Sequence, residues 1–314
     1  MNNVLLDVTY IGRVAYNVAM RYFKGILKAV SIWGQIINKE EFNEKLDPIN
    51  ILIVLDRAIK DILLVQSSIE FDYHTILKAK INVKITTLEE LRGNYLEGVA
   101  SYVLPIINAY YAYGGEILGE IKKEGYKCSE RAINISLERA FIAYGMAIND
   151  LLHNYVEMMA ENLYNSLFYA STAYIQKEEN KVPTSWAAIK TYFGKSNEHY
   201  FSVLFRNAYD SIIRLTTKQD ALESLADTKL KPIEVLYMLM DDKDIYTSVV
   251  YMYELLRALW RAIKKSEIKT IDEVMKIIKL EIQDDYDATI EIWGIDPSPV
   301  LRIKKPGIFK NIEL

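Results

Sequence analysis

The sequence predicts a mainly α-helical protein, built as one or more multi-helix bundles with a minor β element. Only 13 glycines and 7 prolines occur in 314 residues, 51% of which are hydrophobic, so long segments run without a turn-forming residue. Apolar side chains recur every three to four residues through most of these segments, which is the period of an α-helix. Alternation with a period of two, typical of strands, occurs only over short stretches.

The first predicted domain, residues 1–125, is a helical region with one short strand. Apolar residues at helical spacing predict a long amphipathic helix over 14–37. Pro48, whose fixed φ suits a first helical turn, predicts a second helix that continues to residue 69. Residues 80–86 alternate polar and apolar side chains, and we expect a short strand there.

A further helix is expected directly after this strand. Thr87 and Glu90 have the spacing of a capping box, in which a hydroxyl and a carboxylate satisfy the first turn of a helix. The uncharged stretch 98–115 follows and approaches the length of a membrane span. It also contains a proline, an asparagine and four tyrosines, so we interpret it as a buried core helix.

The second predicted domain, residues 126–287, begins after a polar, glycine-containing segment over 122–127. Residues 133–176 keep one apolar register and predict either a single long helix or two helices that break near Gly145. Thr184 or Ser185 is expected to cap a short helix that ends at Gly194. Later helices are predicted over 198–215, 217–226, 232–265 and 270–284.

The last predicted segment, residues 288–314, is a β-hairpin with a basic tail. Residues 289–293 alternate, 294–299 have the composition of a turn, and 300–303 can return as a second strand. Because an isolated two-stranded hairpin is marginal in water, we expect it to rest on the helices or to pair with the strand at 81–85.

Composition excludes several classes of protein. A single cysteine, Cys128, cannot form a disulfide within the chain, and the N-terminal residues lack the features of a signal peptide. We therefore expect a cytoplasmic protein without a membrane role. The formal net charge of −4 gives no overall basic field that would collect nucleic acid. Many charged residues and 23 tyrosines are typical of a thermophile.

Part of the second half resembles the HEPN family. The segments that carry the resemblance are an aromatic, alanine-rich run over 159–175, a loop with Pro-Thr-Ser at 183–185, a short helix to Gly194, and a helix from Tyr200 to Arg214. The resemblance implies a bundle of four to five helices. In active members of that family, an arginine and a histidine four to six residues later cleave RNA.

This nuclease pair is missing from the sequence. No histidine follows Arg214 at the required spacing, and none of the three histidines has an arginine four to six residues upstream. The resemblance therefore implies a non-catalytic binding or assembly protein in RNA-linked or defence-related biology. Its partner would be RNA or another protein, it could form a homo-oligomer, and no cofactor is expected.

One helix face is the best candidate for contact with nucleic acid. Its positively charged residues recur at helical spacing and could meet phosphates, with a tryptophan beside them for stacking on bases. The candidate residues are Arg257, Arg261, Lys264, Lys265 and Trp260.

An alternative hypothesis is a Mg-dependent enzyme acting on isoprenoid diphosphates. Asn149, His153 and Glu157 share one face of a continuous helix and resemble the second metal motif of terpene synthases, with histidine at the middle position. Asp284 and Asp285 resemble an aspartate-rich motif of prenyltransferases, in which paired carboxylates hold Mg²⁺. A third hypothesis is a structural scaffold with no small-molecule site.

Overall fold

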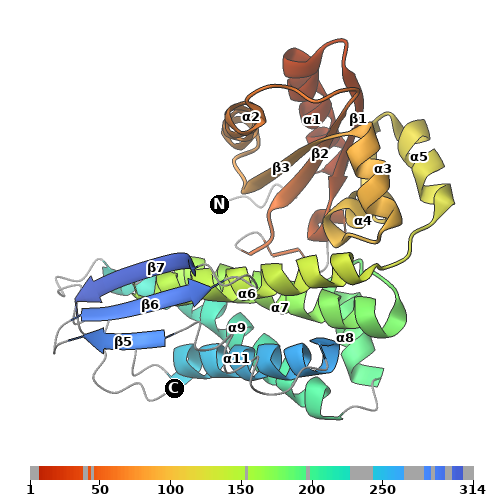
Figure 1. The fold of residues 1–314 in the computed structure, drawn as a ribbon. Coiled ribbons are helices and arrows are strands. Elements are labelled where there is room, and N and C mark those ends of the chain that lie inside the picture. Colours follow the sequence, from red (N-terminus) through yellow and green to blue (C-terminus); the bar gives the residue numbers. More distant parts are fainter. Residues whose placement is uncertain are drawn as a thin grey trace. The chain divides into compact units, whose positions relative to one another are not determined.

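The chain packs into two units (Figure 1). The first unit comprises Met1–Ile135 and Ile175–Tyr192, and the second comprises Ser136–Tyr174 and Phe193–Leu314. The computed structural model describes residues 7–37, 42–43, 46–152, 155–195, 199–226, 243–264, 279–283, 287–293 and 299–306. The predicted fold class is confirmed, because helices dominate and the sheets are small. Within these ranges, no helix has both the length and the apolar content to cross a membrane.

A four-stranded sheet with strand order β3-β2-β1-β4 organises the first unit. The central strand β2 runs antiparallel to β1 and parallel to β3, while the edge strand β4 runs antiparallel to β1. All seven residues of β2 are buried, because helices cover both faces of the sheet. The strands are β1 (Leu27–Trp33), β2 (Ile49–Leu55), β3 (Ile81–Thr87) and β4 (Ala109–Tyr113).

Five helices cover the two faces of this sheet (Figure 1). Helices α1 and α2 pack on the face formed by alternate residues such as Val30, Ile32 and Ile51. Ser31 points to the opposite face and donates a hydrogen bond of 3.0 Å to the carbonyl of Pro105 in α4. The helices are α1 (Val8–Phe23), α2 (Ile62–Leu77), α3 (Leu88–Leu96), α4 (Ala100–Ile107) and α5 (Gly115–Glu124).

In the first unit, three strands occupy positions where the sequence predicts helix, and those predictions are wrong. β1 lies inside the predicted helix 14–37, β2 begins the predicted helix after Pro48, and β4 lies inside the predicted core helix 98–115. A strand that is buried on both faces is a continuous apolar run, and periodicity alone does not separate such a run from a buried helix. The β-branched residues that dominate β2 are typical of strands and could have indicated one here.

The strand predicted over 80–86 and the helix start after it are confirmed. β3 covers Ile81–Thr87, and the Thr87 hydroxyl accepts a hydrogen bond of 3.2 Å from the backbone N–H of Glu90. The outer edge of β3 is partly covered by a side chain, because the Val83 N–H donates to the Glu70 carboxylate at 3.0 Å. A capped edge of this kind resists pairing with another chain.

Long helices form the described core of the second unit. α6 and α7 run antiparallel, and the Ser166 hydroxyl of α7 donates to the Ala140 carbonyl of α6 at 2.7 Å. The long helix predicted over 133–176 divides between Leu152 and Val156, and Gly145 lies inside α6. Helices α9 (His199–Ala226) and α11 (Lys243–Lys264) lie wholly in this unit, together with most of α6 (Glu130–Leu152) and α7 (Val156–Glu179). Most of α8 (Trp186–Lys195) belongs to the first unit.

A separate three-stranded antiparallel sheet lies near the C-terminal end. The predicted hairpin is confirmed, because Ile290 of β6 pairs with Ile303 of β7. The helix predicted to reach residue 284 is wrong over Lys279–Gln283, which forms β5 and pairs with β6. Among the described strands, the hairpin does not pair with β3, which pairs with β2. The strands are β5 (Lys279–Gln283), β6 (Asp287–Trp293) and β7 (Pro299–Pro306).

We predict that Gly114→Ala destabilises the protein, whereas Gly119→Ala does not. Gly114 precedes α5 with a φ of 65°, and a Cβ atom there would lie 2.1 Å from the Lys28 carbonyl oxygen. The left-handed backbone and the clash together cost about 2–4 kcal/mol. Gly119 lies within α5 with open space around it, so alanine there adds about 0.5–1 kcal/mol of stability. Urea unfolding followed by circular dichroism measures both, and equal midpoints would contradict the prediction.

Candidate functional site

An open hollow of about 370 Å³ lies between α9 and α11 in the second unit. Its volume is in the range of sites that bind small molecules or single nucleotides. Small side chains one helical turn apart on α11 leave the space, and larger aromatic and charged side chains border it. The α9–α11 hollow is lined by Tyr200, Phe201, Glu254, Arg257, Ala258, Arg261 and Ala262.

The amphipathic pattern of α11 places the charged residues of the hollow. Leu255, Leu256 and Leu259 are at most 1% exposed and pack into the core. Residues 254, 258 and 261 are spaced i, i+4 and i+7, so they share a different face of the same helix. The hydrophobic burial of the leucines therefore turns Glu254 and Arg261 toward the hollow.

Arg257 and Arg261 have unused hydrogen-bonding capacity. The Nε atom of each is buried and has no hydrogen-bond partner. Among the residues that the structure describes, neither arginine takes part in an ion pair. A guanidinium stays charged at any physiological pH and donates in a planar fork that matches phosphate. An unsatisfied buried donor costs about 1–3 kcal/mol.

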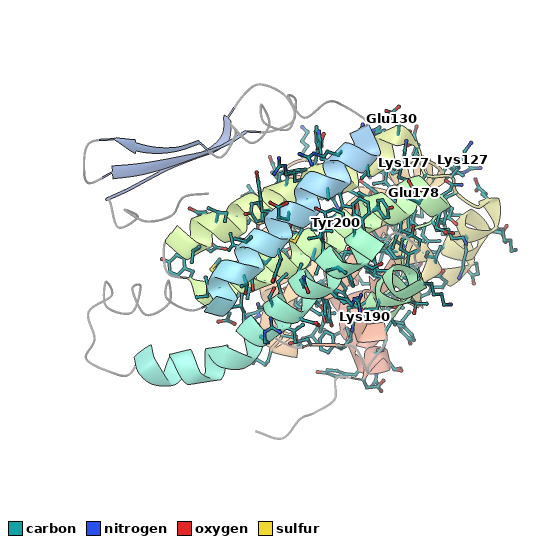
Figure 2. The ribbon with its side chains drawn as sticks, turned by 90° about the horizontal axis from the view of Figure 1, so that it is seen from below. Lys127, Glu130, Lys177, Glu178, Lys190 and Tyr200 are labelled. Carbon is teal, nitrogen blue, oxygen red and sulfur yellow. The ribbon has the colours of Figure 1, made fainter. Side chains whose placement is uncertain are left out.

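The opposite wall of the hollow is aromatic. Phe201 packs against Tyr174 with ring centroids 5.0 Å apart, which anchors this part of α9 to the core. Tyr200 meets the Phe201 ring in an edge-on arrangement at 5.8 Å and is 60% exposed. Figure 2 shows Tyr200 at the start of α9, beside α11. Its ring is therefore held at one side and open to a ligand on the other.

Only some residues of the predicted basic face line the hollow. Arg257 and Arg261 line the hollow, but Trp260 is 3% exposed and packs edge-on against Phe141 at 5.6 Å. The placement of Trp260 as a surface stacking residue is corrected, because position 260 falls on the apolar face of α11. The side chain of Lys264 and all of Lys265 lie outside the described residues.

The metal-binding alternative loses its geometric basis. Asn149 lies near the end of α6 and Glu157 lies in the first turn of α7, where it is exposed. The chain reverses direction between them, so the two residues do not share one helix face as the motif requires. His153, Asp284 and Asp285 lie outside the described residues. Within the described ranges, no group of three or more His, Cys, Asp or Glu residues could hold a metal ion.

The segments that carry the HEPN resemblance form α7, α8 and the first part of α9. The expected cap of the short helix is Ser185, whose hydroxyl accepts from the Ala188 N–H at 3.2 Å. The helices predicted separately over 198–215 and 217–226 are one continuous helix, α9.

Sequence reasoning did not assign Tyr200 or Glu254 to the site. Each residue lies on a helix that is ordinary in composition, and the two helices are separated by about forty residues in the chain. Only the pairing of α9 with α11 brings these side chains to the same hollow as the arginines. No local motif could have predicted that arrangement.

Solved structures include chains with a weak likeness to this one. Neither a protein-family model nor a curated protein sequence matches this chain. The crystal structure of a nucleotidyltransferase-like protein from Exiguobacterium sibiricum is similar at a TM-score of 0.31 and 8% identity, covering 84% of this chain and 80% of that one. At that TM-score the likeness carries neither the fold nor the activity of that protein over to this chain.

Cys128 belongs to the first unit, and its surroundings oppose nucleophilic chemistry. Its backbone N–H donates to the Asn180 side-chain oxygen at 2.7 Å. Burial disfavours the charged thiolate and raises the pKa of Cys128 to about 11, and a hydrogen bond with Gln176 offsets only part of that effect. Since the thiolate is the reactive form, this cysteine is poorly suited to act as a nucleophile.

We predict that the Cys128 thiol reacts slowly with iodoacetamide in the folded protein. A rise in pKa from 9.0 to about 11 lowers the thiolate fraction about hundredfold below the pKa. The alkylation rate should increase with pH until about pH 11, whereas the urea-unfolded protein should level off about two pH units earlier. Mass spectrometry of quenched samples measures both rates, and equal rates in the folded and unfolded protein would contradict the prediction.

Proposed function

We propose that this protein is a non-catalytic, HEPN-like helical protein that binds single-stranded RNA through the α9–α11 hollow. The observation that carries the proposal is that two arginines and an exposed tyrosine line the same hollow. Phosphate oxygens are the ligands that a guanidinium fork fits best. Unpaired bases stack on exposed aromatic rings.

The spacing of the charged groups supports an extended strand as the ligand. Arg257 and Arg261 are four residues apart on α11, which is about 6 Å along the helix axis. This distance is comparable to that between successive phosphates of an extended single strand. A base attached to one of these phosphates can reach the opposite wall, where Tyr200 is exposed. Double-stranded RNA would keep its bases stacked and away from such a wall.

A binding role fits the chemistry of the lining better than catalysis does. The described lining of the hollow contains one carboxylate, one phenol and two guanidinium groups, and no histidine. Cleavage of RNA without a metal needs a pair of groups that exchange protons near neutral pH. Arginine does not release its proton in this range, so the two arginines can hold a phosphate but cannot serve as a base.

We predict that Arg257→Glu and Arg261→Glu each weaken RNA binding by about tenfold or more. A charge-assisted hydrogen bond contributes about 1.5–3 kcal/mol, and the substituted carboxylate also repels the phosphate. Nitrocellulose filter binding with a labelled short single-stranded RNA measures the change.

The matched control for these two variants is Arg206→Glu. Arg206 is exposed on α9 in the same unit but does not line the hollow. The Arg206→Glu variant changes the net charge by the same amount as the two α11 variants. If only the α11 variants lose RNA affinity, the loss is due to their location in the hollow and not to the overall charge. Equal affinity of all three variants and the unaltered protein would contradict the proposal, and absence of RNA binding would favour the scaffold hypothesis.

We further predict that Tyr200→Ala weakens RNA binding by about 1–3 kcal/mol, whereas Tyr200→Phe retains it. Stacking depends on the ring and not on the hydroxyl, and alanine substitution of a stacking residue typically costs this amount. Tyr200 is largely exposed, so neither change should alter the unfolding midpoint greatly. If Tyr200→Phe lost as much affinity as Tyr200→Ala, the hydroxyl and not the ring would be the contact.

A further inference from the structure

Glu254 places a negative charge in the same hollow as the two arginines. It is half-buried, and among the described residues no ion pair or hydrogen bond joins its carboxylate to Arg257 or Arg261. A carboxylate repels the phosphates that the arginines attract, so its position lowers the affinity for a bare phosphate chain. A carboxylate in such a place is useful only if the ligand presents hydrogen-bond donors to it.

The geometry of α11 separates this carboxylate from the more distant arginine. Glu254 and Arg261 lie seven residues apart on one face of the helix, which corresponds to about 10 Å along the axis. Ala258 lies between them and contributes only a methyl group to the lining, so the space between the two charges stays open. That separation is comparable to the distance across a nucleotide, from its phosphate to the far edge of its base.

The three contacts define the parts of a single nucleotide. The phosphate end of such a ligand would meet Arg261 with Arg257 beside it, its flat base would lie against the exposed Tyr200 ring, and the far edge of the base would meet Glu254. An ionised carboxylate is an acceptor only, and its two oxygens can accept two parallel hydrogen bonds. The edge that it recognises must therefore present two neighbouring donors.

Guanine is the RNA base that meets this requirement. Its Watson–Crick edge carries the N1–H and N2–H donors side by side, which match the two oxygens of a carboxylate. Adenine and cytosine each pair an amino donor with a ring acceptor on this edge, and uracil places a single N–H between two carbonyls. For each of these three bases at least one oxygen of Glu254 would face an acceptor or remain unpaired.

We infer that the α9–α11 hollow selects a guanine nucleotide within single-stranded RNA, with Glu254 as the residue that determines specificity. This inference rests on the proposed function, because it requires RNA to occupy the hollow. It adds a preference that two arginines and a tyrosine would not produce, since phosphate contacts and stacking do not distinguish one base from another.

The test compares short oligouridine RNAs that contain one central guanine, adenine or cytosine, or none. Fluorescence anisotropy at fixed salt concentration measures their affinities for the full-length protein. The guanine-containing RNA should bind about tenfold or more tightly than the other three, the size typical of a good bidentate base contact. Glu254→Gln should remove this preference, because the amide presents one donor and one acceptor to the base.

Glu138→Gln is the matched control, since Glu138 is exposed on α6 and does not line the hollow. It should leave the guanine preference unchanged. Glu254→Gln should bind oligouridine as tightly as the unaltered protein or more tightly, because a charge that repels phosphate has been removed; this retained binding also shows that the variant is folded.

The outcomes separate this inference from the proposed function. Equal binding of all four RNAs, with affinity that still depends on Arg257 and Arg261, would overturn the guanine preference and leave RNA binding in place. A guanine preference that survives in Glu254→Gln would overturn the role of Glu254. Absence of binding to every RNA would overturn the proposed function together with the inference.

Discussion

Burial of the apolar face of α11 is the interaction on which the α9–α11 hollow depends. Leu255, Leu256 and Leu259 are at most 1% exposed, and full burial of each such side chain is worth about 1.5–3 kcal/mol. For the three leucines together this is about 4.5–9 kcal/mol, compared with a cost of about 2–6 kcal/mol for leaving two arginine Nε atoms without partners. The leucines therefore determine how α11 is rotated about its axis, and the arginines lie where that rotation puts them.

The helices of the C-terminal half could be predicted, because each of them has one buried face and one solvent-exposed face. Such a helix shows its period in the sequence, as α11 does, and the cap at Ser185 could be predicted from residue types alone. The break between α6 and α7 could not be predicted, since the apolar spacing continues across it and no proline or glycine marks the turn. Tertiary packing of α6 against α7 decides where the chain reverses.

The sheet of the first unit was harder to predict for the opposite reason. β2 is buried along its whole length, so every position of Ile49–Leu55 tolerates an apolar side chain and no alternation remains. β3 was predicted correctly because it is an edge strand whose polar residues still alternate with apolar ones. Alternation therefore revealed β3, whereas β2 left none to recognise.

The candidate site follows the same division between local and tertiary information. Arg257 and Arg261 could be predicted as a pair from their spacing, but the same spacing rule placed Trp260 with them, although the indole belongs to the core. Helical periodicity predicts which residues share a face, but it does not predict how wide the exposed face is. Tyr200 and Glu254 join the site through the packing of α9 on α11, which no local pattern encodes.

The overall charge of the chain limits how the hollow can work. A net charge of −4 does not attract a polyanion over long distances, so association with RNA would gain little from electrostatic steering. The affinity must then come from short-range contacts, which are strongest where water is partly excluded. Half-buried arginines whose Nε donors are already desolvated meet this condition better than lysines on an open surface. A protein that does not attract RNA through its overall charge gains most from contacts that distinguish one nucleotide from another. A carboxylate beside two arginines lowers the affinity for RNA in general and increases the discrimination between nucleotides.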